Sequence, residues 1–211
     1  KRLKYSGCYY PRGDESLDEA EVAMLELYGE RAELDDGQQI LELGCGWGSL
    51  TLWMAERYPN ARIVAVSNSH QQREHIQSQC LERGFDNVQV ITQDVNQLAL
   101  EPTQFDRCVS IEMFEHMSNW RALLERCRTW LATGGQMLIH VFAHQHAPYR
   151  FDPANREDWV AQHFFAGGVM PSRDLIRCFG DVFTVEREWW WNGKNYERTA
   201  LDWLKNFDAN L

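Results

Sequence analysis

Two carboxylates and an imidazole stand close together in the stretch "SIEMFEHM", at Glu112, Glu115 and His116. If this segment is helical, the i, i+3, i+4 spacing places all three side chains on one face. Paired carboxylates attract a cation but also stabilise its charged form, so the imidazole, which titrates near neutrality, is the better proton acceptor. The stretch therefore predicts a proton-transfer site. An alternative stays open, in which Glu115 caps the following helix and His116 packs beneath it.

Three alternate glycines, Gly44, Gly46 and Gly48, separate an apolar stretch from an amphipathic one. In an open α/β sheet, ligands bind beyond the carboxyl ends of the strands, and glycines in the first strand–helix turn let the backbone approach them. A dinucleotide fingerprint requires G-x-G-x-x-G, and Ser49 stands where the third glycine would be. The loop favours close approach to a nucleoside over a pyrophosphate clamp. A tight structural turn is the alternative.

The elements that must position these groups alternate along the chain. Apolar runs predict strands at 40–43, 62–66, 88–92, 105–111 and 136–141. Helical spacing predicts helices at 17–28, 50–58, 71–83 and 120–131. "SLDE" at Ser16 predicts a capping box, and Ser69 an N-cap. Apolar strands alternating with helices imply a parallel sheet covered on both faces.

The last quarter of the chain is less regular. It predicts helices at 152–162, 172–179 and 199–207, and a strand at 183–191. On that strand Trp189 and Trp191 share one face and Trp190 takes the other. The tryptophans could hold a cation, at about 0.5–2 kcal/mol, or at least two of them could simply pack in the core.

The composition is that of one globular domain. The chain has 211 residues, 44% apolar and 25% charged, with a net charge of −10. The acidic balance argues against a nucleic-acid partner and against electrostatic attraction to an anionic membrane. Six scattered cysteines predict free thiols and a cytoplasmic location. No apolar run has the length of a membrane span, so no stable membrane insertion is expected. His140, His144 and His146 have no Cys or carboxylate spacing that completes a metal site, so none is predicted.

Several motifs together resemble one family. They are "YSGCYY", "LELGCGWGSL", "VSNSHQQ", "IEMFEHM", "MPS" and "NGKNY", in this order. The chain is similar to the S-adenosylmethionine-dependent methyltransferases related to cyclopropane fatty acid synthase, and within them to the coclaurine N-methyltransferase-type branch. The resemblance implies an α/β, Rossmann-like class I methyltransferase fold, with a mostly parallel sheet, helices on both faces, and S-adenosylmethionine as cofactor.

The same resemblance implies a domain organisation. Family members carry more residues at both ends, including a final antiparallel strand, so we expect a chain truncated at both ends. Residues 1–15 would form a lid segment. Residues 16–211 would form the S-adenosylmethionine-binding domain, with acceptor-site elements in 142–211.

The cofactor residues follow from matching positions. The resemblance assigns to the cofactor Tyr5, Ser6, Glu42, Gly44, Gly46, Ser67, Asn68, Gln72, Asp94, Val95 and Ile111. Glu42 would orient the loop or the methionine amino group, and Asp94 would accept from the adenine amino group. Ser67 and Asn68 stand where a ribose-binding carboxylate usually ends the strand, and Gln72 would take the ribose instead. Two readings compete: Ser69-x-x-Gln72 is also a capping-box pattern, and the lid residues could be a frayed terminus.

The catalytic roles also come from the resemblance. Methyl transfer is an in-line displacement for which the enzyme supplies proximity and alignment. In the N-methyltransferase branch the acceptor would be the nitrogen of a small, partly aromatic amine. Glu115 and His116 would then be the main acid/base pair and Glu112 the amine-binding carboxylate. His140, Tyr196 and Phe164 would serve the acceptor.

The cyclopropane branch offers different chemistry. There the methyl group goes to a lipid double bond, and a bound bicarbonate removes a proton. The chain keeps three of the family's bicarbonate positions, Glu115, His140 and Tyr196. Where that branch has a cysteine this chain has Gly7, with Cys8 one place later, and Phe142 replaces a small aliphatic residue. Both departures favour amine methylation over an unsaturated lipid acyl chain as acceptor. The oligomeric state is open, with a homodimer as the candidate assembly.

Overall fold

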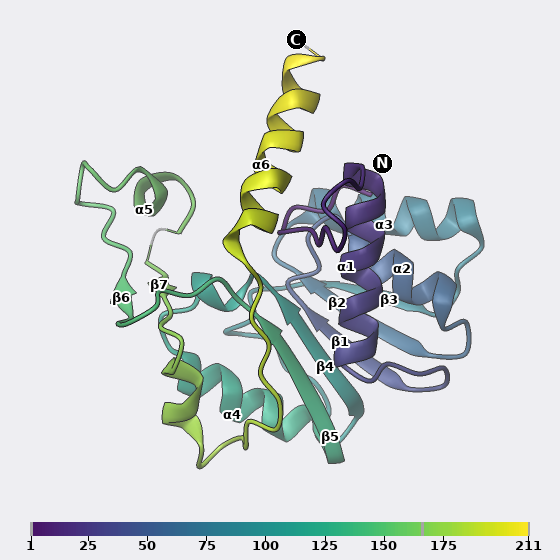
Figure 1. The fold of residues 1–211 in the computed structure, drawn as a ribbon. Coiled ribbons are helices and arrows are strands. Elements are labelled where there is room, and N and C mark those ends of the chain that lie inside the picture. The colour runs from purple at the N-terminus through teal and green to yellow at the C-terminus, as the bar shows by residue number, and fades with distance from the viewer. Residues whose placement is uncertain (1, 166, 211) are drawn as a thin grey trace.

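The computed structural model describes residues 2–165 and 167–210, and its centre is a five-stranded parallel sheet of order β3-β2-β1-β4-β5 (Figure 1). The strands are β1 Gln39–Leu43, β2 Arg62–Ser67, β3 Val88–Thr92, β4 Phe105–Ile111 and β5 Leu131–His140. Each connection between them contains a helix or a crossover segment, as parallel neighbours require. The four main helices around the sheet are α1 Leu17–Arg31, α2 Ser49–Arg57, α3 His70–Arg83 and α4 Trp120–Trp130. The predicted α/β class I fold is confirmed.

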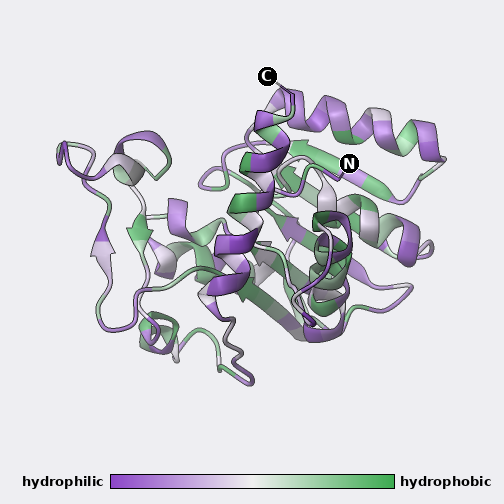
Figure 2. Ribbon diagram, turned by 45° about the horizontal axis from the view of Figure 1, so that its top comes forward, coloured by the Kyte–Doolittle hydropathy of each residue, from purple (hydrophilic) through white to green (hydrophobic). Residues whose placement is uncertain are grey.

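Apolar side chains on opposite faces of the sheet form separate cores. On one face, Ile40 and Ile63 pack with residues of α1 and α2, and α3 continues this layer. On the other face, Leu41 and Leu43 pack against α4. Strands β1 and β2 are buried along almost their whole length, which explains why they read as continuous apolar runs. Figure 2 shows hydrophobic residues along the sheet and more polar ones on the outer helices.

The N-caps that the sequence predicts are present. The hydroxyl of Ser16 accepts from the Glu19 amide at 3.4 Å, and Glu19 Oε2 accepts from the Ser16 amide at 2.8 Å. Both halves of the capping box therefore fix the start of α1. Ser69 likewise caps α3, with its hydroxyl accepting from the Gln72 amide.

The C-terminal quarter departs most from expectation. The predicted helix 152–162 is reduced to α5 Trp159–His163, because Asp152 and Asn155 accept hydrogen bonds from nearby amides in local turns. The two short strands β6 Tyr149–Arg150 and β7 Val169–Met170 form an antiparallel pair that the sequence did not predict. A 3₁₀ helix at Leu175–Phe179 takes part of the predicted helix 172–179. The last helix, α6 Gly193–Asp208, is longer than expected and projects away from the sheet (Figure 1).

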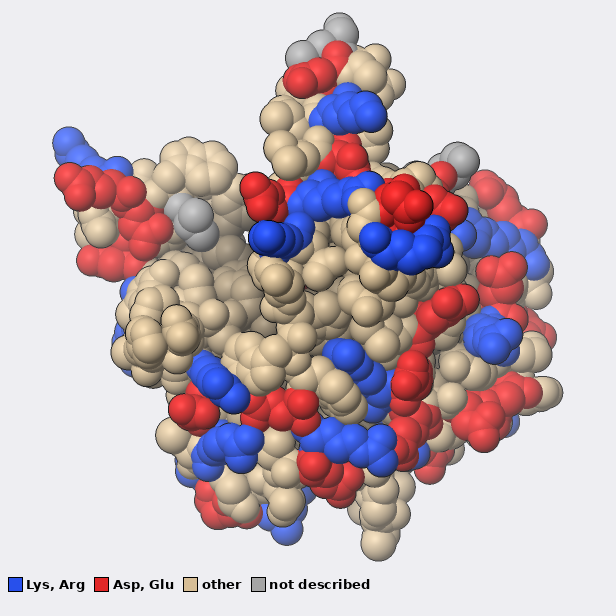
Figure 3. Space-filling model, in the orientation of Figure 1, with Lys and Arg blue, Asp and Glu red and all other residues tan. Residues whose placement is uncertain are grey.

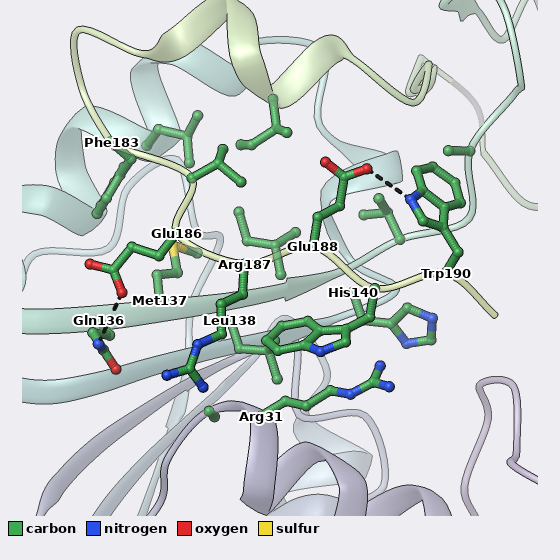
Figure 4. Close-up of a pocket in the computed structure, with 18 of the residues that line it drawn as sticks. Arg31, Gln136, Met137, Leu138, His140, Phe183, Glu186, Arg187, Glu188 and Trp190 are labelled. Atoms are coloured by element: carbon green, nitrogen blue, oxygen red, sulfur yellow. Dashed lines mark hydrogen bonds between the residues drawn. The ribbon is translucent and has the colours of Figure 1, made fainter.

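The prediction of a strand at 183–191 is wrong. The segment runs past β5, but within the described residues it pairs with no strand. A groove of about 1020 Å³ separates the two, and Gln136 Nε2 donates across it to Glu186 Oε2 at 3.3 Å (Figure 4). Paired strands lie about 4.7–4.9 Å apart. Because the groove keeps residues 183–191 away from β5, this segment forms no ladder of hydrogen bonds with it. The alternation of side chains nevertheless survives, because Trp190 is 54% exposed while Trp189 and Trp191 pack on Arg31.

Charged side chains of both signs are interspersed on the face drawn in Figure 3. Within the described residues, no helix is both long and apolar enough to span a bilayer. The six cysteines are free, and all except Cys178 are buried.

Candidate functional site

A cavity of about 690 Å³ opens at the carboxyl ends of β1 to β4, beneath the N-terminal segment. The strand order reverses here, because the chain runs from β1 to β2 on one side and later places β4 on the other. Ligands of open α/β sheets bind at this kind of switch point. All eleven residues that the resemblance assigns to the cofactor line this one cavity.

The glycine loop leaves the cavity open. Gly44, Gly46 and Gly48 all have positive φ, at 80°, 52° and 83°. A Cβ on Gly44 would lie 2.6 Å from Met113 Cγ, so a side chain there would collide with the segment after β4. A Cβ on Gly46 would meet nothing within 4 Å, which leaves free space beside the backbone. Conformation and close approach both require these glycines.

The contacts of Gln72 distinguish between the two roles expected for it, a capping box and ribose binding. Its Oε1 accepts from the Ser67 hydroxyl at 2.5 Å, and the Ser69 amide donates to Ser67 rather than to Gln72. The side chain therefore does not complete a capping box, although Ser69 still caps α3. Gln72 is held beside the end of β2, where it lines the cavity. The ribose role remains a prediction.

The two acidic residues expected at the cofactor differ in environment. Asp94 follows β3, and its Oδ1 accepts from the amide and side chain of Asn96 at 2.8 and 2.9 Å. Glu42 is buried, and its Oε2 accepts from the Thr51 hydroxyl at 2.5 Å. Burial raises the pKa of Glu42 to about 8, with Thr51 acting weakly in the opposite direction. Glu42 thus carries a proton at neutral pH unless a cationic group comes next to it.

The N-terminal segment is anchored rather than frayed. The Cys8 amide donates to Thr199 Oγ1 at 3.0 Å, and the Tyr10 hydroxyl donates to Asp202 Oδ2 at 2.9 Å. The Tyr5 ring stacks on Trp203 at 5.5 Å between centroids. These contacts hold the segment against α6, above the cavity that Tyr5 and Ser6 line. The assignment of residues 1–15 as a lid stays a prediction.

The segment after β4 separates the three candidate catalytic groups. Only Phe114–His116 forms a short 3₁₀ helix, and Glu112 has a positive φ of 48°. The expectation that all three side chains share one helical face therefore does not hold. Glu112 and His116 line the cavity, whereas Glu115 is fully buried and lines neither cavity.

Each of these groups has its own electrostatic setting. Glu112 Oε1 accepts from the Gly7 amide at 2.9 Å and Oε2 from the Tyr196 hydroxyl at 3.3 Å, while burial raises the pKa of Glu112. Burial lowers the pKa of His116, whose ring lies 4.6 Å from that of Phe165. A half-buried neutral imidazole and a carboxyl that line one cavity can together accept a proton and hold a cation.

Glu115 is a buried carboxyl on the interior side of the loop. Its Oε1 accepts from the Phe142 amide at 3.0 Å, and its Oε2 has no hydrogen-bond partner. Burial raises the pKa of Glu115 to about 8, and the nearby Glu112 adds to this. Glu115 is thus mostly protonated at neutral pH, and it joins the loop after β4 to the end of β5.

Two of the three residues expected to serve the acceptor, His140 and Tyr196, line the groove along β5. His140 Nδ1 is 2.8 Å from the Tyr28 hydroxyl, and burial lowers the pKa of His140 to about 3. Figure 4 shows the His140 ring beside an indole, and its centroid lies 4.7 Å from that of Trp191. Phe164 is 45% exposed and lines neither cavity, whereas Phe165 contacts His116 and Phe142.

The positions that distinguish the two chemistries are well defined. A Cβ on Gly7 would lie 3.0 Å from the Tyr196 ring and 3.5 Å from Glu112 Oε1, so a side chain here would point at the acceptor site. Cys8 instead turns inward, fully buried with Tyr10 and Ala20. The thiol of this chain is therefore buried, and it contacts the Ser6 carbonyl of its own segment.

Lys4 also lines the cavity, although no sequence motif indicates this. Lysine side chains are mostly exposed, and only the fold buries this one. Within the described residues, no three His, Cys, Asp or Glu side chains are grouped as a metal site.

Comparison with known proteins gives a consistent result. The family description "Mycolic acid cyclopropane synthetase" matches residues 1–211. The chain is 40% identical to (S)-coclaurine N-methyltransferase of Thalictrum flavum subsp. glaucum, over 99% of this chain and 58% of that protein. It is 31% identical to cyclopropane-fatty-acyl-phospholipid synthase of Escherichia coli K12, over 98% of this chain and 51% of that protein.

A solved structure is similar over the whole chain. It is coclaurine N-methyltransferase bound to N-methylheliamine and SAH, with a TM-score of 0.93 and 39% identity, covering 100% of this chain and 61% of that one. The chain thus spans about three fifths or less of the length of these relatives. Since the family match extends from the first residue to the last, the chain belongs to the mycolic acid cyclopropane synthetase family.

Proposed function

We propose that this protein is an S-adenosylmethionine-dependent methyltransferase whose acceptor is the nitrogen of a small amine. The observation that carries the proposal is the single cavity at the switch point. The residues expected to bind the cofactor line it together with Glu112 and His116. The Thalictrum relative, named as an amine methyltransferase, supports the same reaction.

The residues present suit the expected cofactor. When bound, S-adenosylmethionine supplies an activated sulfonium methyl group. Gly46 leaves room against the backbone, and Gln72 and Asp94 offer polar groups at the ends of β2 and β3. Glu42 is a buried carboxyl that a cationic amino group would stabilise in its ionised form.

The acceptor is held and deprotonated by two groups. Glu112, fixed by the Gly7 amide and the Tyr196 hydroxyl, accepts a hydrogen bond from the ammonium form of the amine. His116 is neutral at physiological pH because burial lowers its pKa, so it can take the proton that the nitrogen must lose to expose its lone pair. Glu115 keeps its proton near pH 7 and acts on the site through the Phe142 amide.

The residue at position 7 argues against the lipid reaction. Where the cyclopropane branch has a cysteine for bicarbonate, this chain has only a backbone amide, and that amide already donates to Glu112. Phe142 further fills the space beside Phe165, with ring centroids 5.2 Å apart. Both features favour a flat aromatic amine over a long acyl chain.

Two measurements on the full chain test the proposal. Calorimetry with SAH should give a saturable binding isotherm, and no heat at millimolar SAH would refute the cofactor assignment. A methyl-transfer assay with radiolabelled cofactor should then compare benzylisoquinolines, simple aryl amines, and vesicles of unsaturated phospholipid. Label in the amines supports the proposal, whereas label only in the vesicles would replace it with lipid methylation. A cytoplasmic location and a homodimer remain predictions from the sequence.

A further inference from the structure

Lys4 is a buried ammonium at the wall of the cofactor cavity. Its residue is only 5% exposed. The Nζ donates to the Ser6 carbonyl at 3.0 Å, to the Ser6 hydroxyl at 2.7 Å and to the Gly7 carbonyl. Three acceptors match the three donors of an ammonium group. The side chain therefore folds back on its own segment and closes a small loop over residues 4–7.

This loop ends on the carboxylate that faces the acceptor. The carbonyl of Gly7 accepts from Lys4, and the amide of the same residue donates to Glu112 Oε1 at 2.9 Å. Gly7 is confined further, because any Cβ on it would touch the Tyr196 ring at 3.0 Å. A change at Lys4 is thus transmitted through one glycine to Glu112.

The positive charge of Lys4 also acts on Glu112. Burial lowers the pKa of Lys4, whereas negative charge on Cys8, Glu112 and Glu21 raises it. The Tyr28 ring lies 5.7 Å from Nζ. The titratable groups facing Lys4 or Glu112 come from every element packed there, namely Cys8, Glu21, Tyr28, Glu112, Glu115, His140 and Tyr196. Among these groups Lys4 is the cation, and two of the carboxyls, Glu21 and Glu112, act on it directly.

We propose that Lys4 is a positioning residue that holds the Gly7 amide on Glu112, the carboxyl that would receive the ammonium group of the acceptor. The inference rests on the proposed amine methylation. Lys4 itself does not touch the transferred methyl group. Its removal should therefore change acceptor binding and its pH dependence, and leave cofactor binding in place.

The variants are Lys4→Met, Lys4→Arg and, as the matched control, Lys205→Met on the exposed face of α6. SAH affinity is measured first by calorimetry and should stay within about threefold of the wild type in all three. Amine binding to the SAH-loaded protein is then measured from pH 6 to pH 9. In Lys4→Met, binding at pH 7 should fall by about tenfold, and its acidic limb should move upward by about one pH unit. Loss of a nearby positive charge lets Glu112 hold its proton to higher pH, which gives this sign. Lys4→Arg should recover part of the shift.

A second readout does not depend on any amine. The carboxyl ¹³C resonance of Glu112, assigned with Glu112→Gln, should titrate at higher pH in Lys4→Met than in the wild type. An unchanged Glu112 titration would overturn the proposal, and so would a loss confined to SAH affinity, which would make Lys4 a cofactor ligand. If the wild type binds no amine but the resonance shifts as expected, the proposed function fails and the role of Lys4 stands. If Lys4→Met does not fold, the same comparison is made with the uncharged polar variant Lys4→Gln, where an unshifted acidic limb and resonance would overturn it.

Discussion

Gly168 packs closely against the backbone of the loop that carries Glu115 and His116. It precedes β7, and a Cβ built on it would lie 2.1 Å from the carbonyl oxygen of Glu115 and 3.1 Å from His116 Cα. These are backbone atoms, so no side-chain rotation can relieve the contact. Gly168→Ala therefore forces the loop that carries Glu115 and His116, or the β6–β7 pair, to move.

The size of the displacement follows from the distance. Real Cβ atoms essentially never approach closer than 3.0 Å, so the backbone must shift by about 1 Å, and a misplacement of that size can lower the rate about 100-fold. Overpacking of this kind costs about 1–3 kcal/mol of stability. We expect the turnover of Gly168→Ala to fall by one to two orders of magnitude, with SAH affinity largely retained because the residues expected to bind the cofactor lie outside residues 115–116.

The assay combines steady-state methyl transfer, SAH calorimetry and thermal unfolding. Gly180→Ala is the matched control, because its Cβ would meet only the Arg177 carbonyl at an ordinary 3.6 Å and its φ is −62°. Turnover at the wild-type level in Gly168→Ala, with the control also unaffected, would refute the view that this contact positions the loop.

Three further outcomes are expected. Glu112→Gln should weaken amine binding by about 10- to 100-fold, since a hydrogen bond to a charged group is worth about 1.5–3 kcal/mol. Calorimetry with the amine and the SAH-loaded protein measures this loss, and an amine affinity equal to that of the wild type would contradict the prediction. His116→Ala should lower turnover by about 100-fold or more. The wild-type rate should decline only below pH 6.5, because burial lowers the pKa of His116. A pH–rate profile in which the rate already falls well above pH 6.5 would exclude His116 as the base. Glu42, whose folded pKa is raised to about 8 from 4.5, destabilises the ligand-free fold as pH rises through that interval. In urea unfolding, Glu42→Gln should therefore match the stability of the wild type near pH 5 and exceed it at pH 8.5. If the difference in unfolding free energy between variant and wild type were the same at both pH values, the raised pKa of Glu42 would be contradicted.

The sequence by itself determined the local elements and the cavity. Apolar runs such as Ile40–Leu43 and the capping box at Ser16 are short-range patterns, and they predicted the strands and the start of α1 where the structure has them. Parallel strands bring their carboxyl ends to one edge, so residues following separate strands, such as Gly44 and Asp94, had to meet. The composition of those turns was enough to predict one site.

Only the tertiary structure decided which side chains face that site. The positive φ of Glu112 breaks the helical register, so Glu115 turns inward while His116 faces the cavity. Residues 183–191 have the alternation of a strand but no adjacent partner, and the groove beside β5 keeps them unpaired. Lys4 is buried in a segment that is held against α6 by contacts nearly two hundred residues apart in sequence, such as that of Cys8 with Thr199. Periodicity records the shape of one segment, whereas pairing, burial and side-chain direction depend on distant segments that no local pattern contains.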